Sequence, residues 1–243
     1  MDLLALDTCD GRGSLAILRD EKVLISVNHD GNSDYSSWIL PAARSILREC
    51  GLAMADLDVL SAASGPGSFT GVRVGLTTIK AWSEAYSKPI VAVSRLEAMA
   101  SEAPVERGEE QGFVAVFFDA QRGQVFGGLY GREQDGLKLV EQEMVIAPDG
   151  FLRWVDDHTS GGTVTWVSMD PDIVSALDGW RNRSRVRPKI QDSPRMLAPT
   201  IGKLAHRRAL QNRFTDALAL DAEYVRRSDA EIFWKGRAQS GGS

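Results

Sequence analysis

The sequence predicts an α/β protein of two related lobes, and three observations carry this prediction. The first hundred residues alternate strand and helix patterns in the order strand, strand, strand, helix, strand, helix, strand, helix. After a charged segment at 101–112, which we expect to be a linker, the pattern partly restarts at Phe113. Asp7 and Asp119 each end an apolar strand, and an Arg-Gly turn follows each of them. This self-similarity suggests a duplicated unit.

The first lobe, residues 1–100, is predicted to begin with a three-strand meander. Short apolar runs at 3–7, 14–19 and 23–27 are separated by glycine and charged residues, which favour turns. Two further strands are expected at 59–63 and 90–93, each followed by a helix. This order of elements is that of the ribonuclease H-like fold, a mixed sheet with helices on its faces.

Three helices are predicted in this lobe. The first is expected to be capped by Ser36 or Ser37, to hold Pro41 in its first turn and to end at Gly51. The second is predicted from about residue 69 to 86, and the third begins near Ser94. Both long helices have apolar faces wider than one sheet requires, which predicts a second packing partner.

The second lobe is predicted over 113–215 as a degenerate copy of the first. Strands are expected at 113–119, 124–130, 137–146, 164–167 and 185–190, with helices at 148–157 and 195–212. Residues 216–243 are assigned to a C-terminal segment that could return to the first lobe and end in a flexible tail. Two ribonuclease H-like lobes with one acidic strand end each form the plan of the actin, sugar kinase and Hsp70 superfamily, in which nucleotide lies between the lobes.

Composition places the chain among globular proteins. It has 243 residues, 43% of them apolar and 25% charged, with a formal charge of −5, which excludes disordered, collagenous and disulfide-dense classes. Cys9 and Cys50 are not closely spaced, so a reducing compartment is expected. No apolar run approaches the about 20 residues of a membrane span, and no secretion signal precedes the first strand. We therefore expect a cytoplasmic protein.

Positive charge is concentrated in one stretch, 181–213, which holds ten basic residues against Asp192 alone. Four of its arginines alternate at period two and would share one face of a strand, which makes them candidate RNA contacts. A solvated surface is the alternative. The four are Arg181, Arg183, Arg185 and Arg187.

A glycine-rich loop, Gly65-Pro-Gly-Ser-Phe-Thr-Gly71, lies between a predicted strand and a predicted helix. Free backbone N–H groups and the helix dipole make such a position suitable for an anion, although the Gly-Lys pair of a P-loop is missing. The alternative is a tight turn in which Ser68 caps the helix. The candidate nucleotide or anion contacts are Asp7, Thr8, Gly65, Gly67, Ser68 and Asp119.

Asp7 and Asp119 leave two interpretations open. They could bind a magnesium ion across a cleft, or each could end its strand by accepting N–H groups of the turn. The three histidines, His29, His158 and His206, have no close spacing, so no metal site is predicted. No histidine lies near Ser68 in the sequence, which speaks against a catalytic triad.

The helix after the glycine loop predicts a contact with another protein. Gly71 and Gly75 lie four residues apart on it, and glycine costs about 1 kcal/mol against alanine in a helix, which suggests close approach of another backbone. Together with the first helix, it would form half of a helical bundle that a partner completes. The predicted interface comprises Ile39, Ala43, Ile46, Gly71, Gly75, Thr78 and Trp82.

Motifs along the whole chain resemble those of the TsaB (YeaZ-like) family. They are Leu3-Leu-Ala-Leu-Asp-Thr8, Ile39-Leu-Pro41, Ser64-Gly-Pro-Gly-Ser-Phe-Thr-Gly-Val-Arg-Val-Gly75, Asp119-Ala-Gln-Arg-Gly-Gln-Val-Phe126 and Tyr224-Val-Arg226. The resemblance implies a subunit that pairs with TsaD, which attaches a threonylcarbamoyl group to adenosine 37 of tRNAs decoding codons that begin with A. In that family the catalysis, the metal and the threonylcarbamoyl adenylate belong to TsaD, and a small ATPase, TsaE, docks on the pair.

The resemblance therefore implies a non-catalytic subunit that binds no cofactor alone, while the assembled complex uses ATP and contacts tRNA. A nucleotide at the partner boundary and a homodimer of the isolated chain stay open. Tyr35, Gln121 and Gln124 depart from the family's histidine, arginine and glutamate. Two other functions are the alternatives: a free-standing ATP-dependent kinase or hydrolase, whose phosphate and adenine motifs are missing here, and a peptidase.

Overall fold

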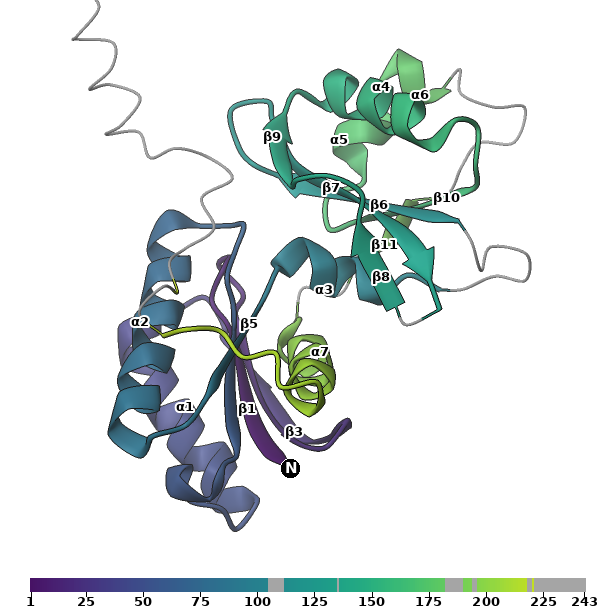
Figure 1. Ribbon diagram of the computed structural model, residues 1–243. Coiled ribbons are helices and arrows are strands. Elements are labelled where there is room, and N and C mark those ends of the chain that lie inside the picture. Colours follow the sequence, from purple (N-terminus) through teal and green to yellow (C-terminus); the bar gives the residue numbers. More distant parts are fainter. Residues whose placement is uncertain (105–111, 135, 182–189, 194–195, 218–219, 221–243) are drawn as a thin grey trace, which may run out of the picture.

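The computed structural model describes residues 1–104, 112–134, 136–181, 190–193, 196–217 and 220, which form two sheets with helices on their faces (Figure 1). The first sheet contains β1 (Asp2–Asp7), β2 (Ser14–Arg19), β3 (Lys22–Asn28), β4 (Val59–Ala63) and β5 (Ile90–Val93). The second contains β6 (Phe113–Asp119), β7 (Val125–Glu133), β8 (Gly136–Leu139), β9 (Met144–Ile146), β10 (Val164–Ser168) and β11 (Ile190–Asp192).

The helices of the first half are α1 (Tyr35–Glu49), the short 3-10 helix η1 (Met54–Asp56), α2 (Phe69–Tyr86) and α3 (Arg95–Ser101). Those of the second half are α4 (Pro148–Thr159), the one-turn helices α5 (Asp172–Ser175) and α6 (Asp178–Arg181), and α7 (Ala198–Leu210). Most elements confirm the sequence prediction within a few residues. The exceptions are the predicted strand at 137–146, which is divided into β8 and β9, and η1, α5 and α6, which were not predicted. The predicted strand at 185–190 lies outside the described residues except for Ile190, where β11 begins.

The two sheets share one plan. The first has the order β3-β2-β1-β4-β5, and the second has the order β8-β7-β6-β10-β11, with β9 added beside β7. In each sheet the first strand is antiparallel to the second and parallel to the fourth, so β6 occupies the place of β1 and β10 the place of β4. This repeat confirms the prediction of two ribonuclease H-like lobes.

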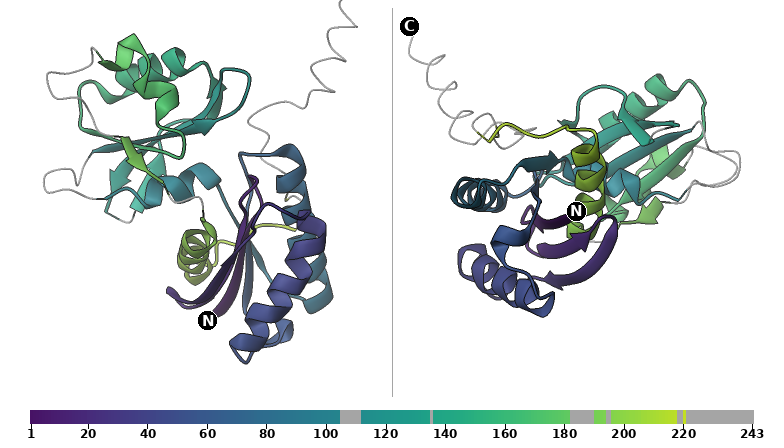
Figure 2. Two further views of the ribbon diagram at one scale, coloured as in Figure 1. Left: turned by 180° about the vertical axis from the view of Figure 1, so that it is seen from behind. Right: turned by 60° about the horizontal axis from the view of Figure 1, so that its bottom comes forward.

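One helix from each half of the chain covers the sheet of the other half. α1 and α2 lie on one face of the first sheet, and α7 lies on the opposite face (Figures 1 and 2). α3 packs on the second sheet, opposite α4, and also touches α7. Ala198 N–H, at the start of α7, donates to Ser14 Oγ at 3.0 Å. The predicted boundary at residue 215 is therefore wrong, because the chain returns to the first lobe at α7.

α1 begins earlier than the sequence suggested. Its N-cap is Asp34. The predicted caps Ser36 and Ser37 both lie inside the helix, so Pro41 falls in the second turn. The reason is the side chain of Tyr35, whose hydroxyl accepts from Gly13 N–H at 2.6 Å and thereby draws the first turn toward the β1 end. Ser68 caps α2, as one interpretation of the glycine loop expected, and the third helix begins near Ser94 as predicted, with the Ser94 hydroxyl accepting N–H groups of α3.

The apolar core is continuous between the two sheets. Leu3, Ile17 and Val93 of the first sheet belong to one buried cluster with Val116 of β6 and Ile201 of α7. A second cluster on the far face of β6 packs against α4 and includes Phe117 and Phe151. Among the described residues, no helix is both long and apolar enough to cross a bilayer.

Candidate functional site

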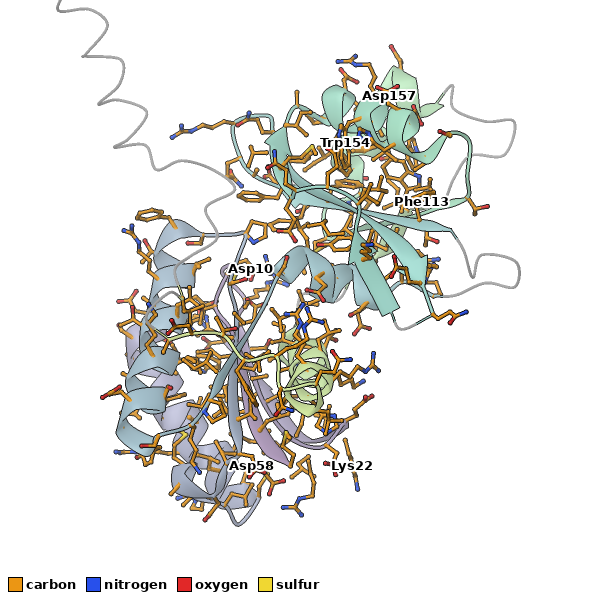
Figure 3. The ribbon with its side chains drawn as sticks, viewed as in Figure 1. Asp10, Lys22, Asp58, Phe113, Trp154 and Asp157 are labelled. Atoms are coloured by element: carbon orange, nitrogen blue, oxygen red, sulfur yellow. The ribbon has the colours of Figure 1, made fainter. Side chains whose placement is uncertain are left out.

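The carboxyl end of β1 is closed by a buried arginine. Asp7, with its side chain 1% exposed, accepts Cys9 N–H on Oδ1 at 2.9 Å and lies 3.4 Å from Arg95 Nε through Oδ2. Arg95 is the first residue of α3 and its side chain is also 1% exposed; its terminal nitrogen pairs with Asp10. Its guanidinium lies 5.1 Å from the ring centre of Phe118 in the second sheet. Figure 3 shows Asp10 at the end of the first sheet nearest the second lobe.

Burial and the charges around this arginine together explain the pKa shifts at the β1 end. Burial lowers the pKa of Arg95, but Asp7 and Asp10 more than compensate, so the pKa lies above its ordinary value and the side chain stays charged. Burial, reinforced by Asp7, holds the pKa of the Cys9 thiol well above its usual range. The site thus contains one buried cation between two carboxylates and a neutral thiol.

The glycine loop packs directly on the residues that follow β1. A Cβ on Gly67 would lie 2.2 Å from Cys9 O, one on Gly71 2.0 Å from Thr8 O, and one on Gly75 2.3 Å from Thr8 Oγ1. The close approach predicted from Gly71 and Gly75 is therefore real, but the backbone that approaches belongs to this chain. The prediction that these two glycines contact a partner is wrong for that reason.

Several polar groups of the loop form hydrogen bonds within the chain. Ser68 N–H donates to Cys9 O at 2.6 Å, and Ser68 Oγ accepts Gly71 N–H at 3.3 Å. Gly65 O accepts Arg95 N–H at 2.6 Å, and Thr8 Oγ1 donates to Gly71 O at 2.6 Å. The interpretation of the loop as a tight turn with Ser68 as helix cap is confirmed by this geometry.

An aromatic cluster covers the other side of the β1 end. The hydroxyl of Tyr35 donates to Asp10 O and accepts from Gly13 N–H, and its ring lies 4.5 Å from that of His29. Trp38 packs edge-on against both rings. Burial raises the pKa of the Tyr35 hydroxyl. Tyr35, at a position where the resemblance implied a histidine, therefore serves to fix the 10–13 turn.

Asp119 ends β6 in a different way. Its Oδ1 accepts Gln121 N–H at 2.7 Å, its Oδ2 accepts the Gln121 amide at 2.8 Å, and its own N–H donates to Asp170 at 3.0 Å. Asp7 and Asp119 therefore both follow the second interpretation, in which the carboxylate accepts an N–H group of the turn that ends its strand. Within the described ranges, no group of three or more His, Cys, Asp or Glu side chains is placed to hold a metal ion.

The three histidines contact residues other than Ser68. His29 contacts Ser33 Oγ at 3.3 Å, His158 contacts Trp154 O at 2.7 Å, and His206 lies 3.5 Å from Asp20. In the part of the chain that the structure describes, no hydrogen bond joins Ser68 to a histidine, which is the contact that would pair a serine nucleophile with its base.

Several predicted interface residues are internal. Ile39, Ala43 and Ile46 are at most 2% exposed and belong to the core under α1, so they contact their own sheet and are not available to a partner. Thr78 and Trp82 are half-buried and stay candidates. The outer surface of α1 and α2, which we call the α1/α2 face, exposes other large apolar side chains: Leu40, Phe69 and Tyr86, at 45%, 40% and 42%.

The candidate RNA contacts are only partly covered by the structure. Arg181 is the last residue of α6, a helical and not a strand position. Arg183, Arg185 and Arg187 lie outside the described residues. Sequence reasoning also missed Arg95 and Asp10, although a cation directly after the Ser94 cap and a second aspartate after Asp7 were visible signals.

Two repeated sheets, each with an aspartate at the end of its first strand, define a two-lobed α/β protein of the actin, sugar kinase and Hsp70 superfamily. A family model described as TsaD, tRNA N6-adenosine threonylcarbamoyltransferase, matches residues 29–161. The TsaB protein of Bacillus subtilis, a tRNA threonylcarbamoyladenosine biosynthesis protein, is 36% identical over 96% of this chain and 98% of its own length. The chain belongs to the TsaB (YeaZ-like) family.

Solved structures agree with this assignment. YeaZ from Pseudomonas aeruginosa superposes with a TM-score of 0.68 at 26% identity, over 92% of this chain and 99% of that one. A second structure from the same organism, described as an uncharacterized protein with similarity to peptidase YEAZ, has a TM-score of 0.69 at 25% identity, over 93% and 99% of the two chains.

Proposed function

We propose that this chain is a non-catalytic scaffold and activator subunit in tRNA threonylcarbamoyladenosine biosynthesis. It would pair with a TsaD-like catalytic subunit that transfers the threonylcarbamoyl group to adenosine 37 of tRNAs reading codons that begin with A. The observation that carries the proposal is the β1 end, where Arg95 fills the space between Asp7 and Asp10. The name of the Bacillus subtilis relative supports the pathway.

The residues at the β1 end do not fit a metal-bound nucleotide phosphate. Both oxygens of Asp7 are engaged, and a guanidinium already supplies the positive charge that a cation would bring. The N–H of Ser68, which could have bound phosphate, donates to Cys9 O. This chain alone is therefore proposed to bind no nucleotide at Asp7, and ATP is proposed to be used by the assembled complex.

The α1/α2 face is proposed as the surface that meets the catalytic subunit. Leu40 on α1, and Phe69 and Tyr86 at the two ends of α2, expose a large part of their apolar area there, and the half-buried Thr78 and Trp82 lie on α2 between its two ends. The TsaD family model matches a segment that includes both helices, so the chain is related to its proposed partner. Related subunits can pair through equivalent helices, and the same face could pair two copies of the isolated chain.

Reconstitution tests the proposal. The mixture contains the TsaD-like and TsaE-like proteins, the adenylate-forming enzyme, ATP, threonine, bicarbonate and tRNA, with or without this chain. We expect modification of tRNA only when the chain is present, and equal rates with and without it would reject the activator role. A series of charge reversals at Arg181, Arg183, Arg185 and Arg187 then asks whether the salt dependence of modification changes, as it would if these residues contact tRNA.

Two assays address the alternatives. Calorimetry of the isolated chain with ATP is expected to show no binding at micromolar concentration, and saturable binding would favour a free-standing kinase or hydrolase. Protease assays are expected to show no peptidase activity in either the wild type or Ser68→Ala. A peptidase activity that Ser68→Ala abolishes would favour the reaction named for the similar structure.

A further inference from the structure

The start of α3 joins three parts of the molecule. Ser94 caps this helix, and its hydroxyl also donates to Glu143, just before β9 of the second sheet. Arg95 N–H donates to Gly65 O of the glycine loop, and its guanidinium pairs with Asp7 and Asp10 after β1 while it lies over Phe118. Movement of Arg95 would therefore change contacts with the glycine loop, with the residues after β1 and with the second lobe.

The residues after β1 form the support on which α2 rests. Thr8 O and Thr8 Oγ1 lie so close to Gly71 and Gly75 that neither position admits a Cβ, and Thr8 Oγ1 donates to Gly71 O. Cys9 O holds the N–H of Ser68 at the N-cap of α2. Because these contacts leave no free space, a displacement of residues 8–10 must displace the first turns of α2.

The support itself is held by charge. Asp7 and Asp10 come from the two ends of a short turn, with side chains 1% and 22% exposed, and Arg95 lies between them. A buried carboxylate without its cation is strongly unfavourable, and two neighbouring carboxylates also repel each other. The bidentate arrangement uses two different nitrogens of one planar guanidinium, which a lysine cannot reproduce.

We propose that Arg95 is a positioning residue that holds residues 8–10 in place and thereby sets α2 for the partner. The part of this proposal that concerns the partner rests on the proposed function. The part that concerns residues 8–10 and α2 is a property of the isolated chain. The two parts can be measured separately.

Cys9 provides the measurement on the isolated chain. It is buried, its thiol faces Ala63 O, and it lies between the two carboxylates in the sequence. Cys50, after the end of α1, is half-buried and serves as an internal reference. We compare the alkylation rates of both cysteines by mass spectrometry in the wild type, Arg95→Met, Arg95→Lys and the double variant Arg95→Met/Asp10→Asn, which restores the net charge of the site.

We expect Arg95→Met to speed alkylation of Cys9 by about tenfold or more through local opening, with Cys50 unchanged. Arg95→Lys should give a smaller increase, and the double variant should recover most of the protection because it removes the excess negative charge. Should Arg95→Met fail to fold, Asp10→Asn alone is used, and an increase of about threefold is expected. Unchanged Cys9 alkylation in a folded variant, or no recovery in the double variant, would overturn the proposal.

Partner binding completes the test. Affinity for the TsaD-like protein is expected to fall about tenfold in Arg95→Met and to recover in the double variant, in parallel with Cys9 protection. Wild-type affinity together with rapid Cys9 alkylation would show that α2 does not follow residues 8–10, and would overturn the coupling. Leu40→Glu, on the α1/α2 face, separates the two hypotheses: if it leaves affinity unchanged, the proposed interface has failed, whereas Cys9 alkylation still decides the role of Arg95.

Discussion

The ends of β1 and β6 occupy equivalent places in two copies of one sheet, and they differ in how their aspartates are satisfied. Asp7 is buried and paired with Arg95, which comes from 88 residues further along the chain. Asp119 is half-buried and bonds within its own turn, to Gln121 two residues away. Both aspartates accept an N–H group of the turn that follows them, so the duplicated plan fixes where an acidic residue falls, while the residues around it decide whether it also belongs to a long-range site.

The two lobes also differ in the connection that follows the fourth strand of each sheet. In the first lobe, β4 leads to β5 through α2, a helix of 18 residues packed tightly on the β1 end. In the second lobe, β10 leads toward β11 through α5 and α6, which have four residues each. A long helix with an exposed apolar surface exists only in the first of these two crossovers, among the residues described, so only that lobe offers the face that we assign to a partner.

The largest difference is expected from added bulk at the β1 end. Gly71→Ala places a methyl group 2.0 Å from a backbone oxygen, so we expect the free energy of unfolding to fall by about 3 kcal/mol or more, despite the better helix propensity of alanine. Gly11→Ala is the matched control, because a Cβ there meets no atom within 4 Å. Urea unfolding of both variants makes the comparison, and equal stabilities would contradict the packing described for α2.

Neutralising the two equivalent aspartates should reduce the free energy of unfolding by different amounts in the two lobes. Asp7→Asn turns an N–H group toward the Arg95 guanidinium, and we expect a loss of about 2–4 kcal/mol of stability. Asp119→Asn keeps an acceptor for Gln121 N–H on a half-buried turn, and a loss of at most about 1 kcal/mol is expected. Denaturant titrations measure both variants, and a larger loss for Asp119→Asn would reverse our ranking of the two sites.

A smaller effect is expected at alkaline pH. Burial keeps the pKa of Cys9 well above 9.0, the value for an unperturbed thiol, so only the unfolded chain loses this proton as pH rises past 9.0. The folded state then binds more protons than the unfolded state, and stability falls with pH by up to about 1.4 kcal/mol per unit for this group. In Cys9→Ala the decline above pH 9 should be shallower by that amount, and an unchanged slope would show that Cys9 does not contribute.

Local patterns were sufficient to predict the elements that surround the site. The bounds of α2, β4, β5 and β6, the Ser68 cap and the start of α3 near Ser94 follow from apolar periodicity and from turn residues, which act over a few positions. The start of α1 could not be found in this way. It depends on the contact of Tyr35 with Gly13, which lies 22 residues earlier.

The contacts that the sequence could not predict are mainly those between side chains distant in the sequence. The pairing of Arg95 with Asp7 and the packing of Gly71 against Thr8 join segments that only the tertiary fold brings together. The periodicity of α1 identified Ile39 as apolar but could not show that its own sheet covers it, while Leu40 stays exposed. Apolar residues can be recognised from sequence, whereas the surface that covers each of them follows from the three-dimensional arrangement.

The central claim is that the α1/α2 face binds a TsaD-like protein, and two leucines test it most directly. Leu40 on α1 and Leu210 at the end of α7 are 45% and 64% exposed and lie on helices at opposite faces of the first sheet (Figures 1 and 2). Calorimetric titration with the TsaD-like protein compares Leu40→Glu with Leu210→Glu. We predict that Leu40→Glu weakens binding about 30-fold or more, as a charge buried in an apolar interface would, while Leu210→Glu binds like the wild type. Equal affinities of the two variants, or loss of binding only in Leu210→Glu, would contradict the account.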